Sequence, residues 1–104
     1  MEVQLNVLDR LTLVSILPTT GRLQELVEVL DIVKLVKFSE EEKKSIGYKE
    51  VDGKVSWDPS KEVLKTFEFT FEHIKVIKDT INKLDEEGKI NLSTLDTCLK
   101  FSKL

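Results

Sequence analysis

The chain has 104 residues, of which 40% are hydrophobic and 34% are charged, and its net charge is -3. This length suits one globular domain, and the apolar content excludes an intrinsically disordered protein. The negative charge disfavours broad electrostatic binding to nucleic acids or anionic membranes, so any basic patch must be local.

The single cysteine, Cys98, cannot form a disulfide within the chain, which favours a reducing compartment. The longest apolar run, residues 11–17, is too short to cross a bilayer, and Met1 and Glu2 do not form the basic start of a secretory signal. We therefore expect a cytoplasmic protein without a membrane partner, a metal or a cofactor.

Short-range patterns predict a strand followed by helices in the first third of the chain. Residues 2–5 alternate polar and apolar side chains, as in a strand. A helix over about 7–17 is opened by Asn6 and stopped by Pro18, and a second helix covers about 22–36.

The second helix is apolar on more than one side. Its main stripe has helical spacing and predicts burial of Leu23, Leu26, Val27, Leu30 and Val33. Leu35 or Val36 could extend this stripe, and Val29 and Ile32 lie outside it. We interpret Val29, Ile32 and Val36 as surplus apolar residues that form a surface for a protein partner or for a second copy of the chain.

A third helix and a hairpin follow. Ser39 and Glu42 have the spacing of a capping box, and Gly47 ends the helix. Glu40 and Glu41 lie in the first turn, where negative charges interact favourably with the helix dipole, so the run of three glutamates has a structural explanation. Residues 48–57 predict a β-hairpin with a tight Asp-Gly turn. Its alternation puts Tyr48, Val55 and Trp57 on one face, and Lys49 and Lys54 on the solvated one.

Phenylalanines alternate in residues 65–71 and predict a third strand. The expected fold is α+β, with helices packed on a three-stranded antiparallel meander of about 48–51, 54–57 and 65–70, which residues 2–5 could extend to four strands. Tyr48 and Trp57 should then cover the phenylalanine strand as a lid. The predicted core is Leu8, Leu11, Val14, Leu26, Leu30, Val33, Trp57, Phe67, Phe69, Ile77, Ile81 and Leu84.

Two helices complete the chain. Thr70 caps a helix in which isoleucines recur at helical spacing, and Ser93 is expected to cap the last helix. The inner stripe of that last helix should contain Leu95, Cys98 and Leu99.

No catalytic motif is present. His73 lacks a nucleophile and an orienting acid at a diagnostic spacing, and Cys98 is expected to be buried and inert. The chain also contains no phosphate-binding glycine loop. We expect a protein that is not an enzyme.

The order of helices and hairpin is also that of a winged helix. The recognition helix would then be EEEKKSI, whose three glutamates would meet phosphates and bases, and no arginine is available there for base contacts. Nucleic-acid binding is therefore disfavoured, although Lys43, Lys44, Lys49 and Lys54 could form a local basic strip.

Three segments carry a family resemblance: LNVLDRLTLVSILPTTG, KFSEEEKKSIGYKEVDGKVSWD and INKLDEEGKI. Together they resemble a group of small uncharacterised proteins encoded by tailed bacteriophages and prophages. The resemblance implies a viral origin and a location in the host cytoplasm. It transfers no functional residue, because the shared motifs are structural.

The leading hypothesis is a non-catalytic interaction protein that binds a host or phage protein through Val29, Ile32 and Val36, with Lys49 and Lys54 as further surface residues. Self-association through the same residues is an alternative account of that surface. A second hypothesis is an oligomeric binder of a nucleotide signal of host defence, with Tyr48, Lys49 or Lys54 lining a pocket between subunits.

Overall fold

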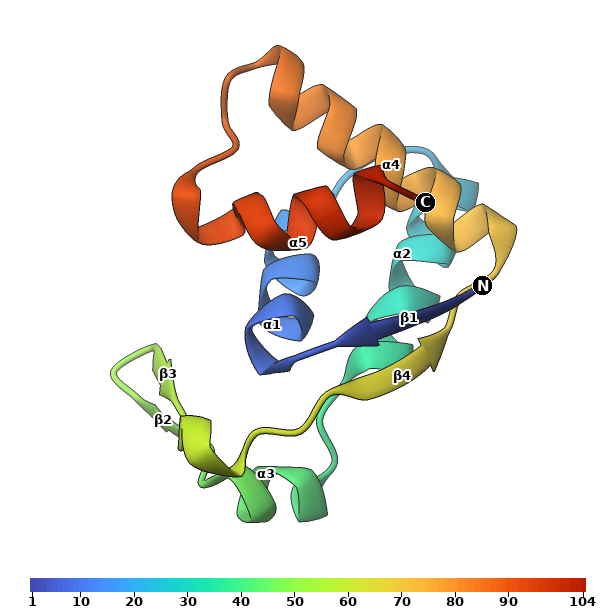
Figure 1. Ribbon diagram of the computed structural model, residues 1–104. Helices are drawn as coiled ribbons and strands as arrows, with labels where there is room; N and C mark the ends of the chain where they lie inside the picture. The colour runs from blue at the N-terminus through green and yellow to red at the C-terminus, as the bar shows by residue number, and fades with distance from the viewer.

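The computed structural model describes residues 1–104 and confirms the predicted α+β class. The elements in chain order are β1 (Glu2–Leu5), α1 (Val7–Ile16), α2 (Leu23–Val36), α3 (Glu40–Ile46), β2 (Lys49–Val51), β3 (Lys54–Ser56), a 3₁₀ turn (Pro59–Lys61), β4 (Lys65–Glu68), α4 (Phe71–Glu86) and α5 (Leu92–Ser102). In Figure 1, α1, α2, α4 and α5 gather around the β1–β4 ribbon, and α3 with the β2–β3 hairpin lies below them.

Reciprocal side-chain caps define where α1, α3, α4 and α5 begin, whereas α2 follows Arg22 without a side-chain cap. The three predicted caps are confirmed: Asn6, Ser39 and Thr70. The predicted cap of the last helix is wrong, because the Asn91 side chain accepts the backbone N–H groups of Ser93 and Thr94. α5 therefore begins at Leu92, and its cap satisfies amides that the first helical turn leaves free.

The hairpin has the predicted turn and register. Asp52 and Gly53 both have positive φ, 52° and 76°, as a two-residue turn of this type requires. Val51 pairs with Lys54 across the turn, and Lys49 pairs with Ser56.

The predicted meander is wrong, although all four strands exist. They form two separate two-stranded sheets, β1–β4 and β2–β3. Asp58 accepts the Ser60 N–H at 3.0 Å and starts the 3₁₀ turn, which leads the chain away from the hairpin. β4 then pairs antiparallel with β1, where Val3 opposite Phe67 adds two buried side chains to the core.

The main core lies between the β1–β4 ribbon and four helices. It contains Val3, Leu5, Leu13, Leu17, Val29, Ile32, Val36, Phe67, Phe69, Ile74, Ile77, Ile81, Cys98 and Phe101. The prediction was right for Phe67, Phe69, Ile77 and Ile81, which are buried. It was wrong for the exposed Leu8, Val14 and Leu30, while the other predicted core residues are half-buried: Leu11, Leu26, Val33, Trp57 and Leu84.

A second, smaller cluster lies under the hairpin. Val7, Phe38 and Ile46 form it, with Tyr48 and Trp57 packed against them. The aromatic pair therefore covers α3 and the end of α2, and the prediction that it covers the phenylalanine strand is wrong. The cause is again the 3₁₀ turn, which separates the hairpin from β4.

Candidate interaction surface

α2 is rotated relative to the sequence prediction. Val29, Ile32 and Val36, predicted to face a partner, are only 8%, 0% and 1% exposed and belong to the main core. Both apolar stripes of α2 have helical spacing, so the period alone does not choose between them. The observed rotation buries the stripe of β-branched residues and brings Glu28 against α4. The predicted interaction residues are thus corrected to core residues.

The opposite stripe of α2 faces solvent. Leu23, Val27 and Leu30 are 83%, 45% and 52% exposed. Positions 23, 27 and 30 are separated by four and three residues, so these side chains follow one another along a single side of the helix. This stripe, which the sequence predicts to be buried, is the exposed apolar surface of α2.

α1 extends this surface. A groove of about 300 Å³ lies between α1 and the second half of α2, and Leu11, Val14 and Val33 line it. Leu30 and Val27 lie three and six residues before Val33 on the same helix. We define the outer face as Leu11, Val14, Val27, Leu30 and Val33.

Arg10 fixes the inner end of the groove. It is buried, its Nε donates to the Val36 carbonyl at 2.9 Å, and its Nη2 donates to the Lys37 carbonyl at 2.9 Å. These carbonyls belong to the C-terminal end of α2, where the helix leaves acceptors unpaired. The guanidinium also stacks 3.8 Å from the Phe38 ring. α1 and α2 are therefore locked together where the groove ends.

The charges that line the groove are all positive. Arg10, Lys37 and Lys43 contribute to its walls, and no carboxylate does. Lys43 lies 3.7 Å from Glu40 and 5.3 Å from the centre of the Tyr48 ring, whereas Lys37 makes no ion pair. Arg10 is paired with Glu42 at 2.7 Å, so Lys37 is the cation of the groove wall that has no acidic partner within the chain.

The hairpin lysines lie elsewhere. Lys49 and Lys54 are exposed on β2 and β3, and neither lines the groove, whereas Tyr48 does. Of the three residues proposed to line a ligand pocket, Tyr48, Lys49 and Lys54, only Tyr48 lies on the wall of the groove.

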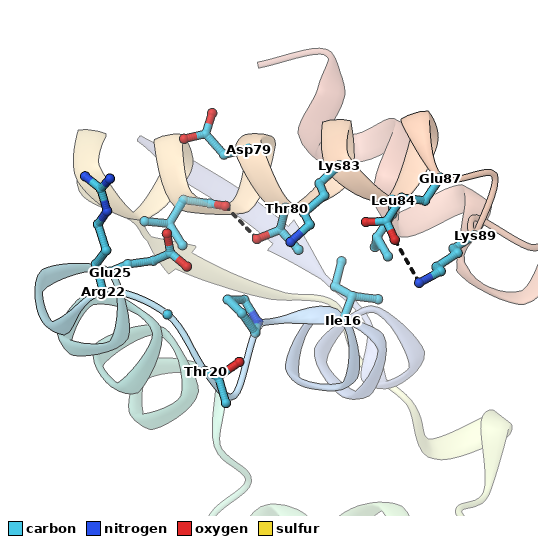
Figure 2. Close-up of a pocket in the computed structure, with 13 residues that line it drawn as sticks. Ile16, Thr20, Arg22, Glu25, Asp79, Thr80, Lys83, Leu84, Glu87 and Lys89 are labelled. Atoms are coloured by element: carbon cyan, nitrogen blue, oxygen red, sulfur yellow. Dashed lines mark hydrogen bonds and ion pairs between the residues drawn. The ribbon is translucent and has the colours of Figure 1, made fainter.

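A second hollow, of about 520 Å³, separates α4 from the segment that joins α1 to α2. Figure 2 shows Lys83 and Thr80 of α4 on one side of this hollow and Thr20 and Arg22 on the other. Its polar lining carries both signs of charge, because Glu25, Asp79 and Glu87 also contribute.

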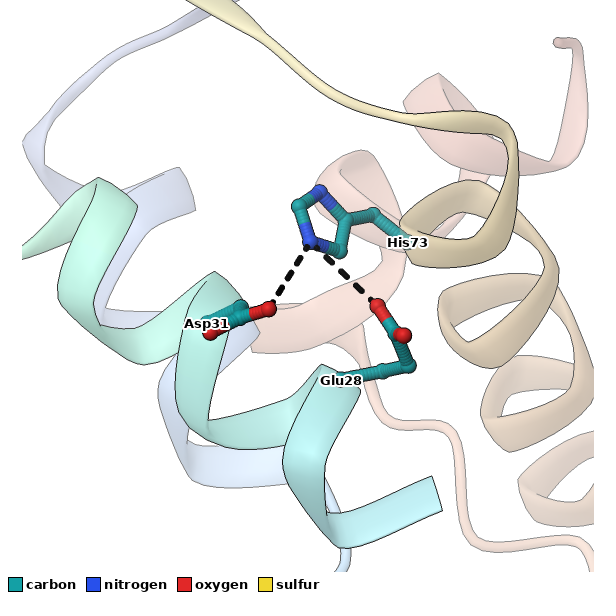
Figure 3. Close-up of side chains that lie close together, drawn as sticks. All are labelled: Glu28, Asp31 and His73. Atoms are coloured by element: carbon teal, nitrogen blue, oxygen red, sulfur yellow. Dashed lines mark ion pairs between the residues drawn. The ribbon is translucent and has the colours of Figure 1, made fainter. Parts of the chain in front are cut away.

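Glu28, Asp31 and His73 form a cluster between α2 and α4. His73 Nε2 lies 3.5 Å from Glu28 Oε2 and 4.0 Å from Asp31 Oδ2, and Figure 3 shows both carboxylates turned toward the ring. Such a set could hold a divalent metal, since the three ligand atoms lie within 4.8 Å of one another.

The other ring nitrogen argues against metal binding. His73 Nδ1 accepts the Thr70 backbone N–H at 3.2 Å as part of the α4 cap. In the neutral ring the proton is then on Nε2, which faces the carboxylates as a donor. A metal bound to Nε2 would require the ring proton to be on Nδ1 instead. Nδ1 could then no longer accept the Thr70 N–H, and two donors would face each other. The cluster is accordingly a contact that joins two helices.

α5 also exposes a leucine stripe. The prediction that Leu95 and Leu99 are inner residues is wrong, since both are exposed, as is Leu92. Cys98 is buried as predicted, and burial raises the pKa of its thiol, while a hydrogen bond with Thr94 opposes the shift. The cap at Asn91 begins the helix earlier than predicted, and the buried stripe contains Thr97, Cys98 and Phe101.

These features define a small α+β protein with an exposed apolar helix face beside a cationic groove. No known protein family matches the chain, and searches of curated proteins and solved structures found no match. None of its helices combines the length and the apolar character needed to span a membrane.

Proposed function

We propose that this protein is a non-catalytic interaction protein that binds another protein through the outer face of α1 and α2. The observation that carries this proposal is the exposure of Val27 and Leu30 next to the apolar groove. Exposed apolar side chains grouped beside a groove are typical of protein-binding surfaces. The resemblance to phage proteins would make the partner a host or phage protein.

The test compares two double variants in affinity purification with quantitative mass spectrometry. Val27→Lys with Leu30→Lys places charges on the outer face, and both residues are exposed enough for the fold to accept them. Leu95→Lys with Leu99→Lys is the matched control on α5, where the exposed fractions are 37% and 43%. Circular dichroism verifies folding of each variant.

We expect proteins retained by the wild type to be retained by the α5 variant and lost by the α2 variant. Loss with the α5 variant alone would move the interaction to α5. Retention by both variants would contradict binding through either surface.

A second candidate function is binding of a small anionic ligand such as a nucleotide. The hollow beside α4 supports it, because Arg22 and Lys83 make no ion pair, whereas two of the three carboxylates that line the hollow are paired, Asp79 with Lys75 at 3.0 Å and Glu87 with Lys89 at 2.8 Å. A ligand at 100 times its Kd adds about 2.7 kcal/mol to folding stability. Thermal unfolding with a nucleotide panel tests this, with Arg22→Ala/Lys83→Ala as control, and no stabilisation by any nucleotide would remove the candidate.

A further inference from the structure

The charges and the shape of the outer face indicate the chemistry of its partner, an inference that rests on the proposed function. We propose that the occupant of the groove is an amphipathic helix of another protein whose apolar side is flanked by aspartate or glutamate residues.

The shape favours a helix. α1 and α2 lie side by side and leave a groove along their exposed sides, and a third helix can complete such a pair as in a small bundle. The groove is lined by the last turns of α2, and the outer face extends back to Val27, so the surface spans residues 27–36, about 15 Å at the usual rise per residue. A partner helix of roughly three turns would cover this length, with apolar residues spaced three and four apart.

The charge pattern favours an acidic partner. The groove wall contains Lys37 and Lys43 and no carboxylate, and Lys34 follows Leu30 by one turn on the exposed side of α2. Lys34 and Lys37 make no ion pair within the chain, so both ammonium groups are available to a ligand. Glu28 of α2 is turned away toward His73 on α4, and Asp31, which is 55% exposed, lies 4.0 Å from the same ring and outside the groove.

The same charges disfavour a second copy of this chain. In a two-fold contact the same surface comes from both subunits. Two such grooves would bring lysines together without a carboxylate in either groove to pair with them. Like charges placed together across an interface oppose association.

The experiment is a selection of peptide binders from a displayed library of random 16-residue sequences, with the whole protein as bait. We expect the selected peptides to have apolar residues at helical spacing with aspartate or glutamate on both sides. Their binding should weaken as salt concentration rises, because screening reduces the attraction between charges.

Two charge-reversal variants test the role of the lysines. Lys34→Glu/Lys37→Glu reverses the cations at the C-terminal end of α2. Lys61→Glu/Lys103→Glu is the matched control, because it makes the same change in net charge and also stands at helix C-terminal ends, at the end of the 3₁₀ turn and at the α5 cap. We expect the first variant to weaken binding of the selected peptides at least tenfold and the control to change it less than twofold.

The other outcomes separate this inference from the proposed function. The selected peptides could fail to bind Val27→Lys/Leu30→Lys and yet be extended, neutral or basic. That result would overturn the inference that the partner is an acidic helix and would leave the outer face as the binding site. Peptides unaffected by that variant, or no selected peptide at all, would overturn both. A wild-type dimer in sedimentation that the same variant dissociates would assign the face to self-association and also overturn the inference.

Discussion

The Arg10 guanidinium lies 2.7 Å from the Glu42 carboxylate and joins the body of the protein to α3. Arg10 comes from α1, whereas Glu42 also caps α3 through the Ser39 N–H. The hydrogen bond from Arg10 is the main cause that lowers the pKa of Glu42 to about 2, against the effect of partial burial. One ion pair thus positions both the end of α2 and the start of the α3 and hairpin segment.

This ion pair makes folding stability sensitive to acid. Because the pKa of Glu42 falls from its ordinary 4.5 to about 2 on folding, its contribution is complete above about pH 4.5 and is lost as pH falls toward 2. Glu42→Gln should cost roughly 1–3 kcal/mol at neutral pH and flatten this part of the pH profile. Urea unfolding between pH 2 and 7 measures both, with the exposed neighbour Glu41→Gln as control. If the free energy of unfolding had the same dependence on pH in the wild type and in Glu42→Gln, the lowered pKa of Glu42 would be contradicted.

A second ion pair fastens α1 to α5. Lys100 Nζ donates to Asp9 Oδ2 at 2.6 Å, and Thr97 Oγ1 donates to Asp9 Oδ1 at 2.7 Å. Burial opposes the charged form of Asp9, yet the hydrogen bonds from Lys100 and Thr97 keep its pKa below the ordinary value. Lys100→Met leaves this buried carboxylate without its cation and should cost about 3 kcal/mol.

A double-mutant cycle tests that explanation. Asp9→Asn/Lys100→Met removes both charges and should recover more than about 1 kcal/mol relative to Lys100→Met alone, because the uncompensated charge is gone. Chemical denaturation of the four proteins gives the coupling energy. Simple additivity of the two single substitutions would show that the pair is not coupled.

The rotation of α2 predicts unequal costs for two neighbouring positions. Ile32→Ala removes a fully buried side chain and should destabilise the protein by about 2–5 kcal/mol. Leu30→Ala removes a half-exposed side chain and should cost less than about 1 kcal/mol. The free energy of unfolding of each variant in urea measures the difference. A larger cost at Leu30 would support the rotation that the sequence pattern favoured.

The neutral His73 ring should carry its proton on Nε2. This follows from the Thr70 N–H, which donates to Nδ1. Long-range ¹H–¹⁵N spectra above pH 8 distinguish the two tautomers directly, and a Zn²⁺ titration of the same sample tests metal binding. A proton on Nδ1, or a specific thermal stabilisation by Zn²⁺, would reopen the cluster of Glu28, Asp31 and His73 as a metal site.

Local signals in the sequence predicted much of the fold. The caps at Asn6, Ser39 and Thr70 and the turn at Asp52 and Gly53 depend on neighbours within a few residues, so the sequence displays them directly. Sheet pairing was predicted less well, because β1 and β4 are far apart in the chain and short strands carry little information about their partners.

The candidate surface required the structure. α2 carries two apolar stripes of equal period, and the choice between them depends on contacts with α4 and α1 that lie outside the helix. The prediction that Val29, Ile32 and Val36 are surplus apolar residues is wrong, because all three are buried, and the exposed apolar residues of α2 include Val27 and Leu30. Lys43 was expected in a basic strip with the hairpin lysines, but the structure places it with Lys37 on the groove wall, which neither Lys49 nor Lys54 lines.

The most direct measurement is the equilibrium Kd of a selected partner peptide for three proteins: the wild type, Val27→Lys/Leu30→Lys and Leu95→Lys/Leu99→Lys. Isothermal titration calorimetry of folded samples gives all three values under one condition. Binding through the outer face predicts at least a tenfold weaker Kd for the α2 variant and less than a twofold change for the α5 variant. Equal affinities for the wild type and the α2 variant would contradict the central claim.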